Sequence, residues 1–150
     1  MTGPVKSPPK GWPRISAAVY YDDAAAAIDW LCRTFGFEVQ LKVEGEGGRI
    51  EHSELVYGDG LIMVSQTGRQ NRLEPVRGAS PRSIDGKVTC ALLVQVDDVD
   101  AHCAHAREMG ARIVDAPETH DYGEDHWADR IYRAEDPEGH QWWFSHRVRG

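Results

Sequence analysis

His52 and Glu54 are the first residues in this 150-residue sequence whose types and spacing could do chemistry. They stand two positions apart in the segment IEHSELVY, and side chains at that spacing on a strand point to the same face. A histidine beside a carboxylate can bind a metal or act as an acid and a base. The same pair can instead lie at the rim of a cavity and only hydrogen-bond neighbouring strands. The sequence favours this structural interpretation and leaves the chemical one open.

A second group of polar residues lies in the segment HDYGEDHW, residues 120–127, which contains two histidines and three carboxylates. A metal site needs converging ligands, which one loop rarely supplies alone. We therefore predict that residues 119–127 form a polar, solvated loop. His126 and Trp127 become ligand contacts if this loop closes over a cavity.

Two adjacent tryptophans in the segment AEDPEGHQWWFSH, residues 134–146, are candidates for stacking on a ligand. Asp136, Pro137 and Gly139 predict a turn, and the aromatic residues after it favour a strand. Successive side chains on a strand point to opposite faces, so one tryptophan faces the core and the other faces outward. We assign Trp143 to the ligand-facing position, with Trp142 as the alternative.

Composition excludes several classes of partner. The formal net charge of −7 argues against nucleic acid and favours a cationic ligand if the charge is focused near a cleft. No apolar run approaches the ~20 residues of a membrane span. Residues 1–13 lack the apolar core of a signal peptide, and the three cysteines indicate reduced thiols. We therefore expect a cytoplasmic protein with no membrane partner.

The sequence predicts no catalytic nucleophile. No serine or cysteine has a histidine or aspartate partner at an informative spacing. The glycine-rich segment 45–48 lacks the lysine and the following helix of a phosphate loop.

Hydrophobic periodicity predicts the order βαβββ twice. The first copy has strands at residues 14–21, 37–43, 50–57 and 61–66, and a helix at 24–35 capped by Asp22 or Asp23 and ended by Gly36. The second has strands at 89–96, 112–115, 130–134 and 140–146, and a helix between Asp97 or Asp98 and Gly110. We therefore predict an N-terminal tail (1–13), a first module (14–66), a connecting loop (67–87) and a second module (88–150).

The two halves share landmarks at nearly constant offsets. The segment VYYDD at 19–23 matches VQVDD at 94–98, Gly36 matches Gly110, and Gly60 matches Gly139. Such regular spacing indicates an internal duplication.

These modules, closed by the pattern D-P-x-G-x-x-W-x-F, resemble the vicinal oxygen chelate superfamily over residues 14–146. Its members include glyoxalase I, extradiol dioxygenases and bleomycin-resistance proteins. The segments IEHSELVYGDGLIMV, VDDVDAHCAHAREMGARIV and DYGEDHWADRIYRAEDPEGHQWWF look most like the bleomycin-resistance or PhnB-like branch. The resemblance implies an α+β fold in which a curved mixed sheet has a concave ligand cavity and helices on its convex side. It also implies a homodimer.

The resemblance also locates the metal positions of the superfamily's enzymes. Each module supplies one ligand from its first strand and one from its last, and these positions fall on Ser16, Val64, Ala91 and Trp143. A serine hydroxyl is a poor ligand, and the other three side chains are not ligands. We therefore predict no metal, no cofactor and no catalytic residue at these positions.

Strand alternation gives the residues expected around the cavity instead. A three-residue hairpin at 58–60 would put Glu54 opposite Val64 and His52 opposite Gln66, and Leu55 against a helix. The predicted ligand-binding residues are Tyr20, His52, Glu54, Gln66, Gln95, His126, Trp127, Trp142 and Trp143. We predict a homodimer that binds a small aromatic or cationic molecule without metal chemistry. The alternative is a lyase, isomerase or dioxygenase-like enzyme that uses His52 and Glu54 as metal ligands or acid–base groups.

Overall fold

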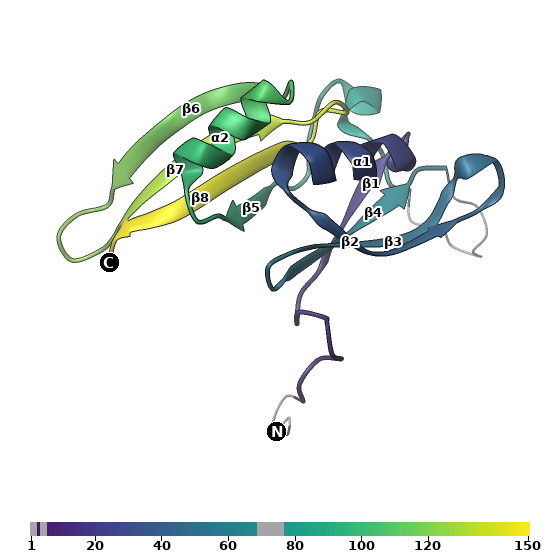
Figure 1. The fold of residues 1–150 in the computed structure, drawn as a ribbon, viewed down its shortest axis with the longest axis horizontal. Coiled ribbons are helices and arrows are strands. Elements are labelled where there is room, and N and C mark those ends of the chain that lie inside the picture. Colours follow the sequence, from purple (N-terminus) through teal and green to yellow (C-terminus); the bar gives the residue numbers. More distant parts are fainter. Residues whose placement is uncertain (1–2, 4–5, 69–76) are drawn as a thin grey trace. The chain divides into compact units, whose positions relative to one another are not determined.

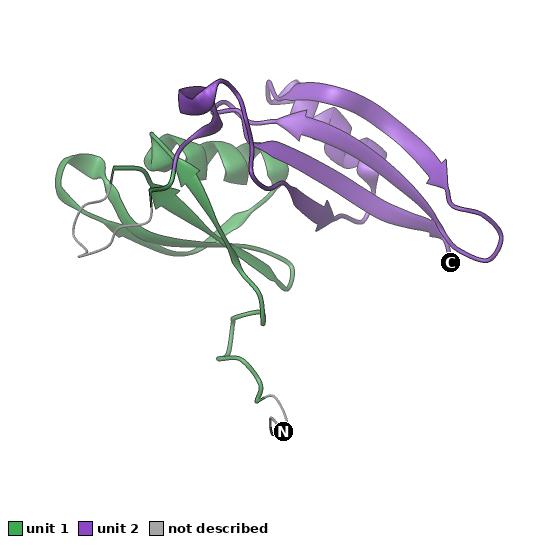
Figure 2. Ribbon diagram, turned by 180° about the vertical axis from the view of Figure 1, so that it is seen from behind, with its two compact units in different colours: residues 1–78 green, residues 79–150 purple. Residues whose placement is uncertain are grey.

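The computed structural model describes residue 3, residues 6–68 and residues 77–150. The chain divides into two compact units, residues 1–78 and residues 79–150, called unit 1 and unit 2 below (Figures 1 and 2). Each unit contains the element order βαβββ, so the expected α+β class and the duplication are both confirmed.

Unit 1 is a four-stranded mixed sheet with one long helix. Its elements are β1 (Ala17–Tyr21), α1 (Ala24–Phe35), β2 (Glu38–Glu44), β3 (Ile50–Tyr57) and β4 (Gly60–Gln66), with a 3-10 turn at Glu46–Gly48. The strand order is β1-β4-β3-β2, in which β1 and β4 are parallel and the other pairs are antiparallel.

Unit 2 repeats this architecture. It contains a 3-10 turn at Pro81–Ile84, then β5 (Leu92–Gln95), α2 (Val99–Glu108), β6 (Arg112–Asp121), β7 (Ala128–Glu135) and β8 (Gln141–Arg149). The order is β5-β8-β7-β6, again with one parallel pair, β5 with β8. Each unit thus contains one four-stranded mixed sheet, in agreement with the two predicted modules.

Both long helices are capped at their N-terminus by the second aspartate of a pair. The Asp23 carboxylate accepts a hydrogen bond from Ala26 N (3.1 Å), and Asp98 does the same for Ala101 N (3.1 Å). Gly36 ends α1 with φ +89°, a left-handed conformation that glycine adopts without strain. The buried face of α1 is formed by Ala24, Ala27, Ile28, Leu31, Thr34 and Phe35.

The core of unit 2 is aromatic and lies beneath α2. Trp142, Phe144 and Tyr132 are at most 1% exposed. The rings of Tyr132 and Phe144 stack at 5.0 Å. His102 of α2 lies 4.3 Å from the Phe144 ring, and its Nδ1 is 2.6 Å from the Tyr132 hydroxyl. Strand positions 132, 142 and 144 therefore face the helix.

The prediction of a loop at residues 119–127 is wrong at its start. Strand β6 continues to Asp121 and pairs with β7 through Thr119–Arg130 and Asp121–Ala128. The Arg149 guanidinium also donates to both Asp121 oxygens at 2.8 Å. The polar composition concealed this strand, because cross-strand charge pairs stabilise it in place of apolar contacts.

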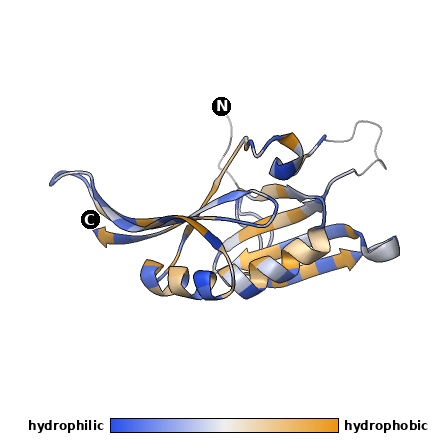
Figure 3. Cartoon of the chain, turned by 90° about the horizontal axis from the view of Figure 1, so that it is seen from above, coloured by the Kyte–Doolittle hydropathy of each residue, from blue (hydrophilic) through white to orange (hydrophobic). Residues whose placement is uncertain are grey.

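The predicted connecting loop, residues 67–87, is divided between the units, and part of it, residues 69–76, lies outside the described chain. The described strands carry both hydrophobic and hydrophilic residues (Figure 3). Within the described residues, no helix is long and apolar enough to cross a membrane.

Candidate functional site

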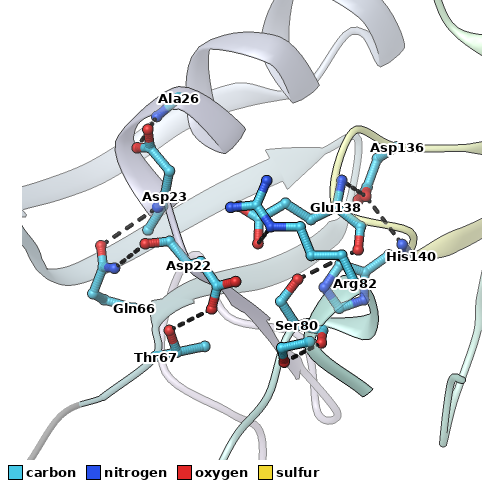
Figure 4. Close-up of polar contacts among 12 residues, drawn as sticks. Asp22, Asp23, Ala26, Gln66, Thr67, Ser80, Arg82, Asp136, Glu138 and His140 are labelled. Carbon is cyan, nitrogen blue, oxygen red and sulfur yellow. Dashed lines mark hydrogen bonds and ion pairs between the residues drawn. The ribbon is translucent and has the colours of Figure 1, made fainter. Parts of the chain in front are cut away.

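Two contacts show which face of the unit 1 sheet carries α1. The Gln66 side chain accepts from Ala24 N at the start of α1 (3.4 Å) and donates to the Asp22 carbonyl, as Figure 4 shows. At the other end of α1, the Tyr57 ring lies against Gly36. Because alternate residues share a face, Val64 lies with Gln66 and Leu55 with Tyr57 on the helix-bearing face. The opposite face is called the open face below.

The predicted hairpin register is off by one residue. Tyr57 pairs with Gly60, Val56 with Leu61 and Leu55 with Ile62, so the loop is Gly58-Asp59 alone. Ser53, whose Oγ hydrogen-bonds both Val64 O (2.8 Å) and Val64 N (3.0 Å), therefore takes the place predicted for Glu54. The turn sequence Gly-Asp-Gly fits a two-residue or a three-residue loop, and only the tertiary packing decides between them.

Val64 and Gln66 also lie on the helix-bearing face, contrary to the prediction. Val64 is 1% exposed and pairs with the buried Val19. His52 and Glu54 nevertheless lie on the open face, as expected. The prediction made two errors, the face of Val64 and the residue opposite Val64, and each error exchanges the faces of β3, so together they leave Glu54 on the expected face. Leu55 packs on the helix side, as predicted, with no exposed surface.

A bulge in β2 builds the polar cluster around Glu54. Val39 pairs with Leu55 and Leu41 pairs with Glu54, so Gln40 is an extra residue between them. A bulge re-aims the local side chains. Gln40 Nε2 donates to Glu54 Oε1 (2.9 Å), while His52 Nε2 lies 2.7 Å from Glu54 Oε2.

The Glu54 carboxylate is buried but stays charged. Its side chain is 9% exposed, whereas the His52 side chain is 40% exposed. The Gln40 amide, and then the His52 imidazole, lower the pKa of Glu54 below its ordinary value, against the opposing effect of burial. Both oxygens are therefore occupied, and His52 is the accessible member of the pair.

Tyr20, a predicted ligand contact, is half-buried against the backbone of unit 1. Its ring lies so close to Gly78 that a side chain on that glycine would overlap it. Tyr20 belongs to the open face by alternation, since Val19 and Tyr21 are buried on the other face. One side of its ring is thus already covered.

The face of the unit 2 sheet that points away from α2, called its open face, carries Trp143. Leu93 pairs with Trp143 in the β5–β8 ladder, and Gln95 and Gln141 share this face by alternation. Trp143 is partly exposed and Leu93 is 58% exposed. The Arg133 guanidinium lies over the Trp143 ring, 5.2 Å from its centre.

Arg133 connects this ring to a carboxylate. Its Nε lies 2.8 Å from Asp115 Oδ2, an ion-pair distance, although the geometry is not that of a hydrogen bond. A cation over an indole ring is attracted by the ring's negative face. The place that the sequence assigned to a cationic ligand is therefore occupied by the protein's own arginine.

Trp142 faces the opposite way, into the core. It has no exposed surface, and its Nε1 donates to Asp136 Oδ2 (3.0 Å). In Figure 4 the same carboxylate also holds the turn that precedes β8. The sequence left undecided which of the two tryptophans faces outward, and in the structure it is Trp143.

His126 and Trp127 lie in the short connection between β6 and β7. Trp127 is 42% exposed, and Arg147 covers its ring at 5.1 Å. Tyr122 and His126 are its aromatic neighbours, with ring centres 5.7 and 6.0 Å away. Together these residues form a local aromatic cluster within unit 2.

The residues at the superfamily's metal positions do not fit a divalent ion. The parallel pairs Val19–Val64 and Val94–Phe144 show that Met63, and not Val64, corresponds to Trp143. In unit 1 the positions are then Ser16 and Met63, and in unit 2 Ala91 and Trp143. The Ser16 hydroxyl is buried with no hydrogen-bond partner among the described residues, but one hydroxyl and a thioether do not make a site for a hard cation. No group of three or more histidine, cysteine, aspartate or glutamate residues in the described chain is arranged to hold a metal.

Comparison with known proteins agrees with the architecture. Residues 15–144 match the family model of the glyoxalase/bleomycin resistance protein/dioxygenase superfamily. The chain belongs to this superfamily. An uncharacterized protein of Mycobacterium bovis is 30% identical over 137 residues, which cover 91% of this chain and 85% of the relative.

Two solved structures show the same fold. TioX from Micromonospora sp. ML1 is 31% identical with a TM-score of 0.70, covering 91% of this chain and 99% of its own. TnmS3 from Streptomyces sp. CB03234, an antibiotic binding protein, is 22% identical with a TM-score of 0.64, covering 89% and 93%. At that identity, TnmS3 shows the fold alone.

Two residues that shape the open faces were not predicted from the sequence. Gln40 reaches Glu54 only because of the bulge in β2, and a bulge leaves no clear mark in the sequence. Arg133 lies beside Trp143 because the two residues pair directly across β7 and β8. Arg133 could be assigned to the open face only once the register of β7 and β8 was known.

Proposed function

We propose that this protein binds a small aromatic molecule on the open faces of its sheets, without metal chemistry. The observation that carries the proposal is the partly exposed Trp143 ring, which stands at a position where the superfamily's enzymes place a metal ligand. A flat indole can stack on an aromatic ligand but cannot coordinate an ion. The antibiotic-binding activity of the structural neighbour TnmS3 supports the same class of function.

The charges on the open faces favour neutral or anionic rings. Arg133 already supplies the cation over Trp143, and both Glu54 oxygens are bound by Gln40 and His52. A cationic ligand would have to displace one of these contacts. We therefore favour an aromatic ligand without positive charge, and we propose that it is bound by a cytoplasmic homodimer.

Replacing Trp143 and Trp142 separately tests this function. Trp143→Ala should weaken binding of a neutral ring such as 4-nitroanisole by up to about tenfold, since stacking contributes ~0.5–1.5 kcal/mol beyond area burial. Its melting temperature should change little. Trp142→Ala is the matched variant, and it should cost about 3–5 kcal/mol of stability because it empties a buried site. Equilibrium dialysis and thermal unfolding measure both. Unchanged affinity in a folded Trp143→Ala protein would refute the stacking role.

A second candidate function is acid–base catalysis by His52 and Glu54. The 2.7 Å contact between them favours it, because a carboxylate that orients an imidazole is a recurring catalytic arrangement. Turnover of a substrate that is lost in His52→Gln would establish this function in place of simple binding.

A further inference from the structure

The surface around His52 and Glu54 is apolar although the pair itself is polar. In the β2–β3 ladder, Leu41 lies opposite Glu54 and Val43 lies opposite His52, and each is 43% exposed. Continuing the β3–β4 register places Met63 opposite Glu54. One imidazole is thus set in a half-exposed apolar strip, which suits a ring that carries a single polar group.

The hydrogen bonds determine which imidazole nitrogen faces a ligand. An ionised carboxylate only accepts, so His52 Nε2 carries the proton in the 2.7 Å contact with Glu54 Oε2. In the neutral ring Nδ1 is then an acceptor. Gln40 holds the other oxygen of Glu54 at 2.9 Å, so the carboxylate cannot turn away. A carboxylate behind an imidazole fixes the tautomer and the orientation of the ring.

We propose that His52 Nδ1 takes up the proton of an acidic hydroxyl on an aromatic ligand of the phenol type and holds the ligand as its phenolate. The ligand's O–H bond breaks as the N–H bond forms on Nδ1, and no further reactant is required. The imidazolium then lies between two anions, the Glu54 carboxylate and the phenolate. This inference rests on the proposed function, since it requires an aromatic ligand on the open face of unit 1.

The charged residues around His52 and Glu54 make the binding of a phenolate depend on the protonation of His52. Strand β2 carries Glu38, Lys42 and Glu44, of which the last two pair at 3.1 Å, and β3 adds Glu51. Strands β1 and β4 contribute no charged side chain. On β2, Glu38 pairs with Val56 and so shares the open face, whereas Lys42 pairs with Ser53 and points, with Glu44, to the helix-bearing face. The proton taken up by His52 therefore supplies the positive charge that holds the phenolate on the open face.

The experiment compares two matched probes. In 4-nitrophenol the phenol and phenolate forms absorb at different wavelengths, and in 4-nitroanisole a methyl group replaces the hydroxyl proton. Equilibrium dialysis is done roughly one pH unit below the pKa of the free phenol. We expect 4-nitrophenol to bind at least about tenfold more tightly than 4-nitroanisole, and the bound probe to show the phenolate spectrum.

Variants of His52 and Glu54 test whether these two residues cause the preference for 4-nitrophenol and its phenolate spectrum. His52→Gln should abolish both the preference and the phenolate band while 4-nitroanisole still binds. Glu54 is a positioning residue, so Glu54→Gln should weaken the phenolate band without changing the affinity for 4-nitroanisole. His105→Gln on α2 and Glu44→Gln on β2 are matched controls, and neither should change the spectrum.

The outcomes separate the two proposals. Equal affinity of the wild-type protein for both probes, or a preference that survives His52→Gln, overturns the phenolate inference and leaves aromatic binding standing. If neither probe binds, the proposed function fails together with the inference.

Discussion

Asp136 shows how much one carboxylate contributes to this fold at the scale of a residue. Its Oδ1 accepts from the backbone N–H groups of Glu138 and His140, and its Oδ2 accepts from Trp142 Nε1, all at 3.0 Å. The side chain is 5% exposed. One buried anion thus fixes the turn before β8 and the orientation of the largest core side chain. That orientation in turn directs Trp143 to the open face.

Asp136→Asn tests this role with almost no change in shape. The asparagine oxygen can still accept from the backbone, but its NH₂ group would then meet the Trp142 N–H, and two donors cannot satisfy each other. We expect a loss of about 1–3 kcal/mol in the free energy of unfolding, the cost of an unsatisfied buried polar group. Urea denaturation measures it. In a Trp142→Phe background the same substitution should cost clearly less, and equal costs in both backgrounds would contradict the explanation.

The duplication is clearest at the scale of elements, because the two modules use equivalent residues for equivalent tasks. In each module the second aspartate of the pair after the first strand caps the long helix, through Ala26 N in one and Ala101 N in the other. The parallel strand pairs are also equivalent, Val19–Val64 and Val94–Phe144. The two caps should therefore have similar energetic effects.

Removing each cap tests that equivalence. Asp23→Ala and Asp98→Ala should each destabilise the protein by about 0.5–2 kcal/mol, the usual effect of losing an N-cap. Asp97→Ala is the matched control, since Asp97 precedes the capping residue and is exposed. It should have a much smaller effect in chemical denaturation. A loss on Asp97→Ala as large as that on Asp98→Ala would show that the caps are wrongly assigned.

The sequence predicted the features that depend on local chemistry. The aspartate caps, the terminal glycine of α1 and the full extent of β3 follow from residue types along the chain, and so does the αβ order. The register of the β3–β4 hairpin and the bulge at Gln40 do not, because Gly58-Asp59-Gly60 permits more than one loop. A shift of one residue exchanges the two faces of a strand. The match of Val64 to Trp143 was also off by one residue, so Val64 and Gln66 were predicted on the wrong face. Strand β6 was predicted too short for a different reason, because its residues become polar.

At the scale of the whole molecule, the outer edges of the two sheets differ in character. In the described chain the edge strands are β1 and β2 in unit 1 and β5 and β6 in unit 2. Strand β2 exposes Val39, Leu41 and Val43 by 43–46%, and β5 exposes Leu93 by 58%. Strand β6 instead carries Arg112, Asp115, Glu118 and Asp121. Charges protect an edge from pairing, whereas exposed apolar residues favour association.

This difference leads to a prediction about assembly. We expect a homodimer at micromolar concentration, formed through an apolar edge, because burying the exposed apolar side chains of that edge in an interface is favourable. Sedimentation equilibrium should give the dimer mass for the wild-type protein. Leu93→Lys or the double change Leu41→Lys and Val43→Lys should shift the equilibrium toward monomer, since a lysine would be buried without a partner. Thr119→Lys on the charged edge strand β6 should leave the dimer intact. A monomeric wild-type protein, or a dimer unaffected by any apolar-edge variant, would show that these strands face solvent.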